Sequence, residues 1–196
     1  MALATVILFN KPYGVLCQFT SPAQRPCLKD FVPIPQVYPA GRLDTDSEGL
    51  LVLTGDGALQ ARIAEPRRKL VKVYWAQVDG SPAVEDLRAM SAGLDLGDFV
   101  TRPCRVRRMD EPGGLWQRDP PIRRRLQIPT TWLELGLEQG KNRQVRRMTA
   151  KIGHPTLRLI RWSVGPWSLE GLAPGQWREV AIPADIVCQP RNRRKR

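Results

Sequence analysis

The sequence predicts an α+β fold, with a mixed, mostly antiparallel sheet flanked by helices. Apolar runs typical of strands recur along its 196 residues, and several follow one another with no helical pattern between them. Helical patterns interrupt the runs irregularly, whereas a doubly wound parallel sheet needs regular alternation of strands and helices. A chain of this length and ordinary hydrophobic content buries a substantial core, so it is typical of a globular protein.

The strands are predicted from apolar composition and from a period of two. An apolar run at residues 5–9 opens the chain, and a continuous apolar run follows at 50–54. Alternating or apolar runs rich in β-branched and aromatic residues lie at 70–78, 100–109, 131–137 and 156–164. Helices are predicted between them at 58–64, 83–91 and 142–152.

Two stretches are predicted to lie outside these elements. Residues 111–121 are rich in proline and glycine, with arginines at 123–125 beyond them, and favour an exposed loop between two strands. Residues 189–196 hold no apolar side chain that could dock, which predicts a disordered basic tail after a single domain at 1–188.

The formal net charge of +12 is concentrated in the C-terminal part of the chain. Residues 1–140 hold 18 Lys and Arg against 16 Asp and Glu, whereas residues 141–196 hold 13 against 3. Such a one-sided field favours a polyanionic partner, most often nucleic acid, over a membrane surface. No apolar run approaches the roughly 20 residues of a membrane span, and the apolar N-terminus lacks the positive leader of a secretory signal. We therefore expect a cytoplasmic protein with no membrane partner.

The residue types argue against a metal site. Asp44, Asp46 and Glu48 alternate as in an EF-hand calcium loop, but the twelfth position, which should supply a bidentate Glu, is Gly55. The four cysteines lack the paired spacing of a zinc site, so we expect reduced structural thiols at positions 17, 27, 104 and 188. A P-loop is absent as well, because no glycine-rich segment ends in Gly-Lys-Ser or Gly-Lys-Thr.

Asp44 is the best candidate for chemistry. It stands beside Arg42 in a glycine-flanked loop that leads into a buried strand. A free carboxylate in a loop that meets RNA repels the phosphates, so its presence needs an explanation, and catalysis is the first candidate. The single histidine, His154, follows a helix end, where it more often caps the helix than acts as a base. Carboxylates act as nucleophiles at anomeric carbons. A solvated loop charge is the alternative explanation.

A basic helix provides the second candidate segment. On the predicted helix, Arg146 lies at the border between an apolar stripe and a basic face, from which its planar guanidinium reaches a partly buried carboxylate. The stripe holds Val145, Met148 and Ile152, and the basic face holds Arg143, Arg147 and Lys151. An ordinary amphipathic surface helix gives the same pattern.

A strand provides the third candidate segment. In the strand at 70–78, Lys72 and Tyr74 point to one side. Tyr74 could stack on a base or pass a proton, although most tyrosines in strands simply pack.

Together, three segments resemble the motifs of the RsuA-type pseudouridine synthases. They are Gly41-Arg-Leu-Asp44, Lys72-Val-Tyr74 and Gly140-Lys-Asn-Arg-Gln-Val-Arg-Arg-Met148, in this order. The segments Phe9-Asn-Lys-Pro-Tyr-Gly-Val-Leu16 and Pro155-Thr-Leu-Arg-Leu-Ile-Arg161 are also similar to that family. The resemblance spans about residues 6–180 and implies the pseudouridine synthase catalytic fold, beginning directly at the catalytic domain, with no separate S4-like RNA-binding domain.

The resemblance implies an RNA isomerase that needs no cofactor. Such an enzyme breaks the bond between uracil N1 and the ribose, turns the base, and rejoins it through C5 to the same sugar carbon. Asp44 would be the nucleophile, Arg146 the arginine that pairs with it, and Tyr74 the residue that lies against the base and helps to remove the C5 proton. The uridine must first leave the base stack, and Arg42 would fill the gap.

The resemblance also implies large-subunit ribosomal RNA as the partner, free or in pre-ribosomal particles, bound by a monomer in a bacterial cytoplasm. The expected RNA-binding residues are Arg42, Lys141, Asn142, Arg143, Gln144, Arg147 and Arg161. Phosphate contacts from the basic ones should weaken steeply with salt. A non-catalytic RNA-binding ribosome assembly factor is the alternative function, and a glycosylase or nucleoside hydrolase that uses Asp44 and releases free uracil is a weaker one.

Overall fold

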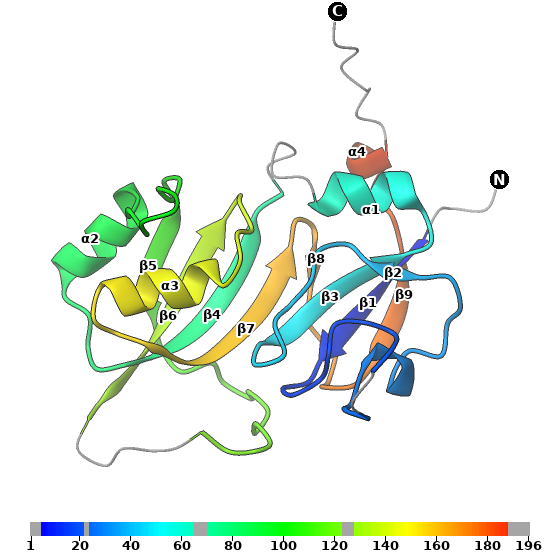
Figure 1. The fold of residues 1–196 in the computed structure, drawn as a ribbon, viewed down its shortest axis with the longest axis horizontal. Coiled ribbons are helices and arrows are strands. Elements are labelled where there is room, and N and C mark those ends of the chain that lie inside the picture. Colours follow the sequence, from blue (N-terminus) through cyan, green and yellow to red (C-terminus); the bar gives the residue numbers. More distant parts are fainter. Residues whose placement is uncertain (1–4, 22–23, 65–69, 123–127, 188–196) are drawn as a thin grey trace, which may run out of the picture.

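One nine-stranded sheet organises the chain (Figure 1). The structure is a computed structural model and describes residues 5–21, 24–64, 70–122 and 128–187. Seven strands follow the order β5-β6-β4-β7-β3-β1-β9, with β2 paired to β3 and β8 paired to β7. The strands are β1 (Thr5–Lys11), β2 (Tyr38–Pro39), β3 (Glu48–Thr54), β4 (Lys72–Asp79), β5 (Arg105–Met109), β6 (Thr130–Leu137), β7 (Thr156–Val164), β8 (Trp167–Ser168) and β9 (Trp177–Ala181).

Only the contact between β3 and β7 is parallel, among the strand pairs of the described residues. The mixed, mostly antiparallel sheet predicted from the sequence is therefore confirmed.

The helices lie in two groups. Helices α2 (Val84–Ala92) and α3 (Gln144–Lys151) lie side by side over β4, β5 and β6 (Figure 1). Their Met90, Val145 and Met148 join the core cluster that contains Tyr74 and Leu135. Helices α1 (Gly57–Ala64) and α4 (Ala184–Val187) lie together at the other half of the molecule, and a short 3-10 turn spans Leu28–Asp30.

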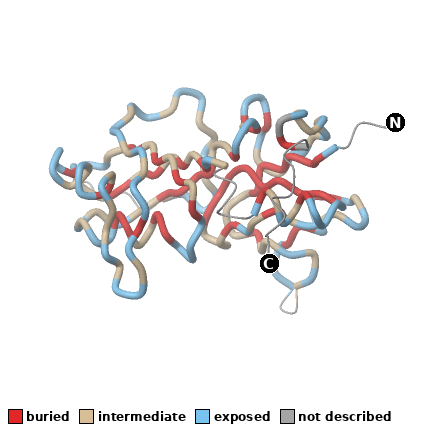
Figure 2. Tube along the Cα trace, turned by 90° about the horizontal axis from the view of Figure 1, so that it is seen from above, coloured by how far each residue is buried: buried red, intermediate tan, exposed pale blue. Residues whose placement is uncertain are grey.

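Strand β3 is buried on both faces, which explains its continuous apolar run. Leu50 and Val52 belong to one core cluster and Leu51 and Leu53 to another, and all four are fully buried. Figure 2 shows buried backbone running through the centre of the molecule, with exposed residues at its periphery. The loop that precedes β3 is thus attached to a rigid element.

All six predicted strands and all three predicted helices exist; β7 has the predicted ends, and the others are shifted at one or both ends. Strand β5 begins at Arg105 rather than at residue 100, because Val100 forms an isolated bridge with Asp95 in the preceding loop. Helix α3 begins at Gln144, two residues later than predicted, because Arg143 has a left-handed backbone with φ of 49°. Strand β9, which pairs with β1, was not predicted, since its exposed and half-buried residues give no apolar run.

The predicted loop at 111–121 connects β5 and β6. The arginines at 123–125 and the tail at 189–196 lie outside the described residues. Cys17, Cys27 and Cys104 are free thiols, and Cys188 also lies outside the described residues. No helix within the described ranges is long and apolar enough to cross a membrane.

Candidate active site

A cavity of about 860 Å³ lies between β4, the loop at 41–47 and the loop at 139–143. We call residues 41–47 the Asp44 loop. The cavity gathers most of the predicted site residues: Arg42, Asp44, Tyr74, Lys141, Asn142, Arg143, Gln144 and Arg161 all line it. Arg146 and Arg147 do not. Another hollow of about 790 Å³ lies beneath the 111–122 loop, but none of the predicted site residues lines it, so we assign the chemistry to the first cavity.

Arg161 holds the backbone of the Asp44 loop. Its Nε donates to the carbonyl of Leu50 at 2.8 Å, and its Nη1 and Nη2 lie 3.4 Å from the carbonyls of Arg42 and Gly41. The residue is only 2% exposed. In the structure Arg161 is engaged by loop carbonyls, because β7 runs beside β3 and turns this side chain beneath the loop, while the expected phosphate contact stays a prediction.

Gly49 allows β3 and β7 to approach closely. Its φ is +109°, and a Cβ at this position would lie 2.5 Å from the carbonyl oxygen of Arg161. A second anchor comes from the segment after β1, where the Gly14 N–H donates to the Thr45 carbonyl at 2.8 Å. The Asp44 loop is thus fixed from both sides.

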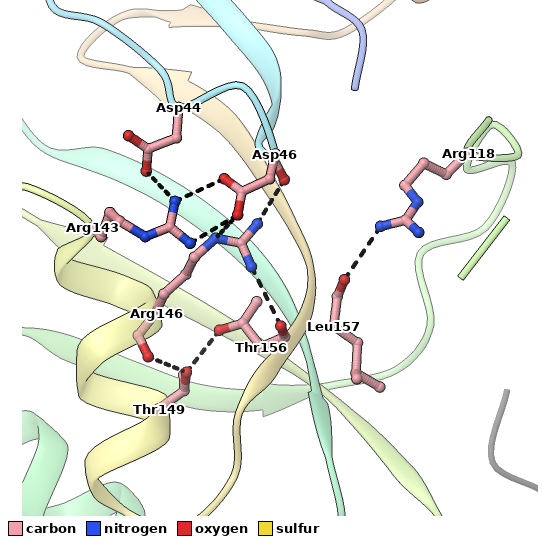
Figure 3. A network of polar contacts seen from close by, with 8 residues as sticks. All are labelled: Asp44, Asp46, Arg118, Arg143, Arg146, Thr149, Thr156 and Leu157. Atoms are coloured by element: carbon pink, nitrogen blue, oxygen red, sulfur yellow. Dashed lines mark hydrogen bonds and ion pairs between the residues drawn. The ribbon is translucent and has the colours of Figure 1, made fainter. Parts of the chain in front are cut away.

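Arg143 reaches both aspartates of the loop (Figure 3). It donates two parallel hydrogen bonds to Asp46, at 3.0 and 2.8 Å, and its Nη1 lies 3.6 Å from Oδ2 of Asp44. Such a two-pronged contact to a carboxylate is strong and directional. The side chain of Asp44 keeps 37% exposure, so a substrate can reach it.

Arg146 contacts Asp46, and the expected pairing with Asp44 is not observed. Its Nη2 donates to the backbone carbonyl of Asp46 at 2.6 Å, and its Nε forms an ion pair with the Asp46 carboxylate at 3.4 Å, without hydrogen-bond geometry. Its Nη1 donates to the Thr156 carbonyl at 3.3 Å, while Thr149 and Thr156 share a hydrogen bond beside it (Figure 3). Because Arg146 leaves α3 on its half-buried side, it reaches the end of the loop rather than Asp44.

Asp46 was not predicted as a site residue. Burial acts to raise its pKa, but the hydrogen bonds from Arg143 and the charges of Arg146 and Arg143 outweigh this effect, so the pKa lies below its usual value. Asp46 is therefore a permanent anion that positions both arginines. Its alternation with Asp44 and Glu48 was the only sequence signal, and that pattern was considered only as a calcium loop, which Gly55 argues against.

The other motif residues divide into buried and exposed groups. Tyr74 is 9% exposed at the cavity, and Lys72, also buried, lies two residues before it on β4. Gln144 is 4% exposed and bonds to Gln139 and to the Lys141 N–H. The amide of Gln144 is thus used inside the protein, and its expected contact with RNA stays a prediction.

The exposed residues remain available to RNA. Arg42, Lys141, Asn142 and Arg143 are exposed around the cavity. Arg147 lies outside it, where it pairs with Asp98 and donates to the Leu96 carbonyl at 2.9 Å.

Comparison with known proteins shows the family to which this chain belongs. The family model for RNA pseudouridylate synthases matches residues 5–151, which include all the side chains around Asp44 described above except Thr156 and Arg161. The chain belongs to the RNA pseudouridylate synthase family. It is accordingly an isomerase that acts on RNA.

Relatives in this family are similar over most of their length. A ribosomal large subunit pseudouridine synthase E from Vibrio vulnificus (strain CMCP6) is 50% identical over 184 residues, which cover 94% of this chain and 78% of the relative. One of the same name from Xanthomonas axonopodis pv. citri (strain 306) is 56% identical over 171 residues, covering 86% and 90%. A crystal structure of a pseudouridylate synthase matches with a TM-score of 0.74 and 26% identity, over 94% of this chain and 74% of that one.

Proposed function

We propose that the chain converts a specific uridine of large-subunit ribosomal RNA to pseudouridine, with Asp44 as the nucleophile, in the bacterial cytoplasm. The observation that supports this most directly is the position of Asp44: half-exposed in a cavity, beside Arg143, with Tyr74 on the same wall. The substrate class follows the names of the relatives, which are synthases of the ribosomal large subunit.

The cavity suits a nucleotide that has left the base stack. Arg42, Lys141 and Arg143 are exposed around it and offer positive charge to the RNA backbone. Arg42 precedes the nucleophile by two residues and is the natural side chain to replace the extruded base. Tyr74, buried on the adjoining strand, offers its ring to the uracil.

The chemistry follows from the positions of these groups. Asp44 attacks the nucleotide, the bond between N1 and the ribose breaks, and the uracil turns so that C5 faces the same sugar carbon. When C5 bonds to that carbon, the bond made by Asp44 breaks and frees its carboxylate. The C5 proton then leaves, with Tyr74 as the group placed to assist its removal, and N1 takes up a proton. Arg143 places its positive charge 3.6 Å from the carboxylate of Asp44, beside the reacting group.

Substitution of Asp44 tests this proposal. Asp44→Asn should abolish the release of tritium from RNA labelled at C5 of uridine, because only rejoining through C5 displaces that hydrogen, while RNA binding should change little. Asp46→Asn is the matched control: the same change in the same loop, on a side chain of similar exposure, 34% against 37%. We expect it to retain measurable turnover, since it loosens the arginines without removing the nucleophile.

Equal turnover in wild type and Asp44→Asn would remove the nucleophile assignment. Two other outcomes would favour the alternative functions. A complete lack of turnover in wild type would favour an RNA-binding assembly factor. Free uracil in the wild-type reaction would instead indicate a glycosylase.

A further inference from the structure

Lys72 is a buried cation that faces the active-site cavity. It opens β4, is 5% exposed, and lines the cavity together with Tyr74. No hydrogen bond or ion pair joins its ammonium to another described residue, and the ammonium is not among the fully buried polar atoms without a partner, so it reaches the cavity. Because the rest of the side chain is buried, the cavity is where this ammonium finds an acceptor.

Lys11 shows how the same fold treats a structural lysine. It is fully buried, and its Nζ donates to the carbonyls of Pro12 and Val15, both at 2.9 Å. The pKa of each lysine is lowered to about 8, chiefly by burial, and the charge of Arg161 contributes to the lowering of both. Both are therefore mostly protonated at neutral pH, but only Lys11 has acceptors of its own.

The missing acceptor is supplied most simply by the base of the substrate. Lys72 is buried on the same side of β4 as Tyr74, whereas the phosphate-binding candidates Arg42, Lys141 and Arg143 are exposed at the mouth of the cavity. A base turned inward reaches the buried strand, and its phosphates stay outside. Building on the proposed function, we infer that Lys72 binds a carbonyl oxygen of the target uracil and stabilises the negative charge that forms on its ring.

The charge arises from the bond that breaks. When the electron pair of the N1–ribose bond moves onto the ring, the uracil becomes an anion whose charge is shared by N1, O2 and O4. Attack of Asp44 on the ring would also place negative charge on these oxygens. When C5 bonds to the sugar carbon, the ring becomes neutral; the C5 proton then leaves and N1 takes up a proton, which gives neutral pseudouridine. Lys72 stays protonated throughout and donates a hydrogen bond that is strongest in the charged state, as in an oxyanion hole.

Two substitutions distinguish this role from a structural one. Lys72→Met removes the charge while keeping the length of the side chain. It should lower the single-turnover rate of tritium release by about 100-fold, leave RNA affinity within about threefold, and raise the thermal midpoint, because a buried charge without a partner is lost. The matched control Lys11→Met should lower the thermal midpoint, because two carbonyls lose their donor.

Chemical rescue provides the second measurement. Lys72→Ala should be equally slow, and added propylammonium should restore part of its rate by entering the vacated space beside the cavity. Tetramethylammonium, which has the charge but no N–H donor, should not. The assays use the full chain and unmodified large-subunit ribosomal RNA made by transcription with uridine tritiated at C5.

The outcomes separate this inference from the proposed function. No tritium release by wild type would overturn both. With an active wild type, the role of Lys72 is overturned if Lys72→Met reacts within about threefold of the wild-type rate, if it is unfolded or less stable, if the whole loss lies in RNA affinity, or if both amines restore Lys72→Ala equally.

Discussion

Glu48 and Arg158 form an ion pair buried beneath the Asp44 loop, and its disruption gives a large, measurable effect. The side chains are 2% and 6% exposed. Nε and Nη2 of Arg158 donate to the two carboxylate oxygens of Glu48, each at 2.8 Å, and Nε1 of Trp116 donates to Glu48 at 2.8 Å. We expect Glu48→Gln to lower the free energy of unfolding by about 3 to 5 kcal/mol, since it leaves a buried guanidinium without its counter-charge.

Arg107 and Glu134 provide the matched control. This pair also has an arginine Nε–carboxylate contact of 2.8 Å and a nearby tryptophan donor, Trp75, but its side chains are 66% and 29% exposed. Because water screens an exposed pair, Glu134→Gln should cost about 1 kcal/mol or less. Both values are obtained from urea titrations followed by circular dichroism, with linear extrapolation to water.

A double variant isolates the electrostatic part. Combining Glu48→Gln with Arg158→Met removes the unpaired charge, so it should be less destabilised than the sum of the two single variants. The reasoning is refuted if Glu48→Gln and Glu134→Gln cost the same within about 1 kcal/mol, or if the two substitutions in the buried pair are additive.

Two other positions test the packing of β3 and the burial of β1. A Cβ on Gly49 would lie 2.5 Å from the Arg161 carbonyl, so Gly49→Ala should lower the free energy of unfolding by at least about 2 kcal/mol in urea titrations. The control Gly57→Ala, whose Cβ would meet nothing within 4 Å, should stay within about 1 kcal/mol of wild type. Similar losses of stability in the two variants would contradict this. Burial lowers the pKa of Lys11 from 10.5 to about 8, so between these values the unfolded chain binds more protons, and the difference in unfolding free energy between wild type and Lys11→Met should increase with pH. A constant or decreasing difference from pH of about 8 to about 10 would show that Lys11 titrates normally.

Local pattern was sufficient for the main elements, whereas the nucleophile candidate needed the resemblance of three separate segments to a family. The run Leu50 to Leu53 predicted a buried strand because every residue in it is apolar, and both faces of β3 are indeed covered. For Asp44 the local pattern indicated only that a carboxylate before such a strand, in a basic chain, needs an explanation, and a solvated loop charge was the alternative. Its proposed role came from the order of the three motifs, which place Tyr74 and Arg146 downstream.

Long-range contacts were beyond the reach of local pattern. The helical wheel placed Arg143 on the basic face of a helix, but its left-handed backbone ends the loop before α3 and turns its guanidinium toward Asp46, 97 residues away in sequence. Arg161 looked like a surface cation, yet the parallel contact of β7 with β3 buries it. Neither position could be inferred without the pairing of the strands.

The division of labour between two aspartates explains why the Asp44 loop holds two acids. Hydrogen bonds that stabilise a carboxylate also make it a weaker nucleophile, so an arginine bound tightly to Asp44 would slow its attack. In the structure Asp46 accepts the short bonds of Arg143 and the backbone contact of Arg146 lies on Asp46 as well, whereas the one ion pair of Asp44 within the described residues is 3.6 Å long. Asp46 thereby fixes the positive charge next to Asp44, and under the proposed mechanism the nucleophile itself stays free to move onto the substrate.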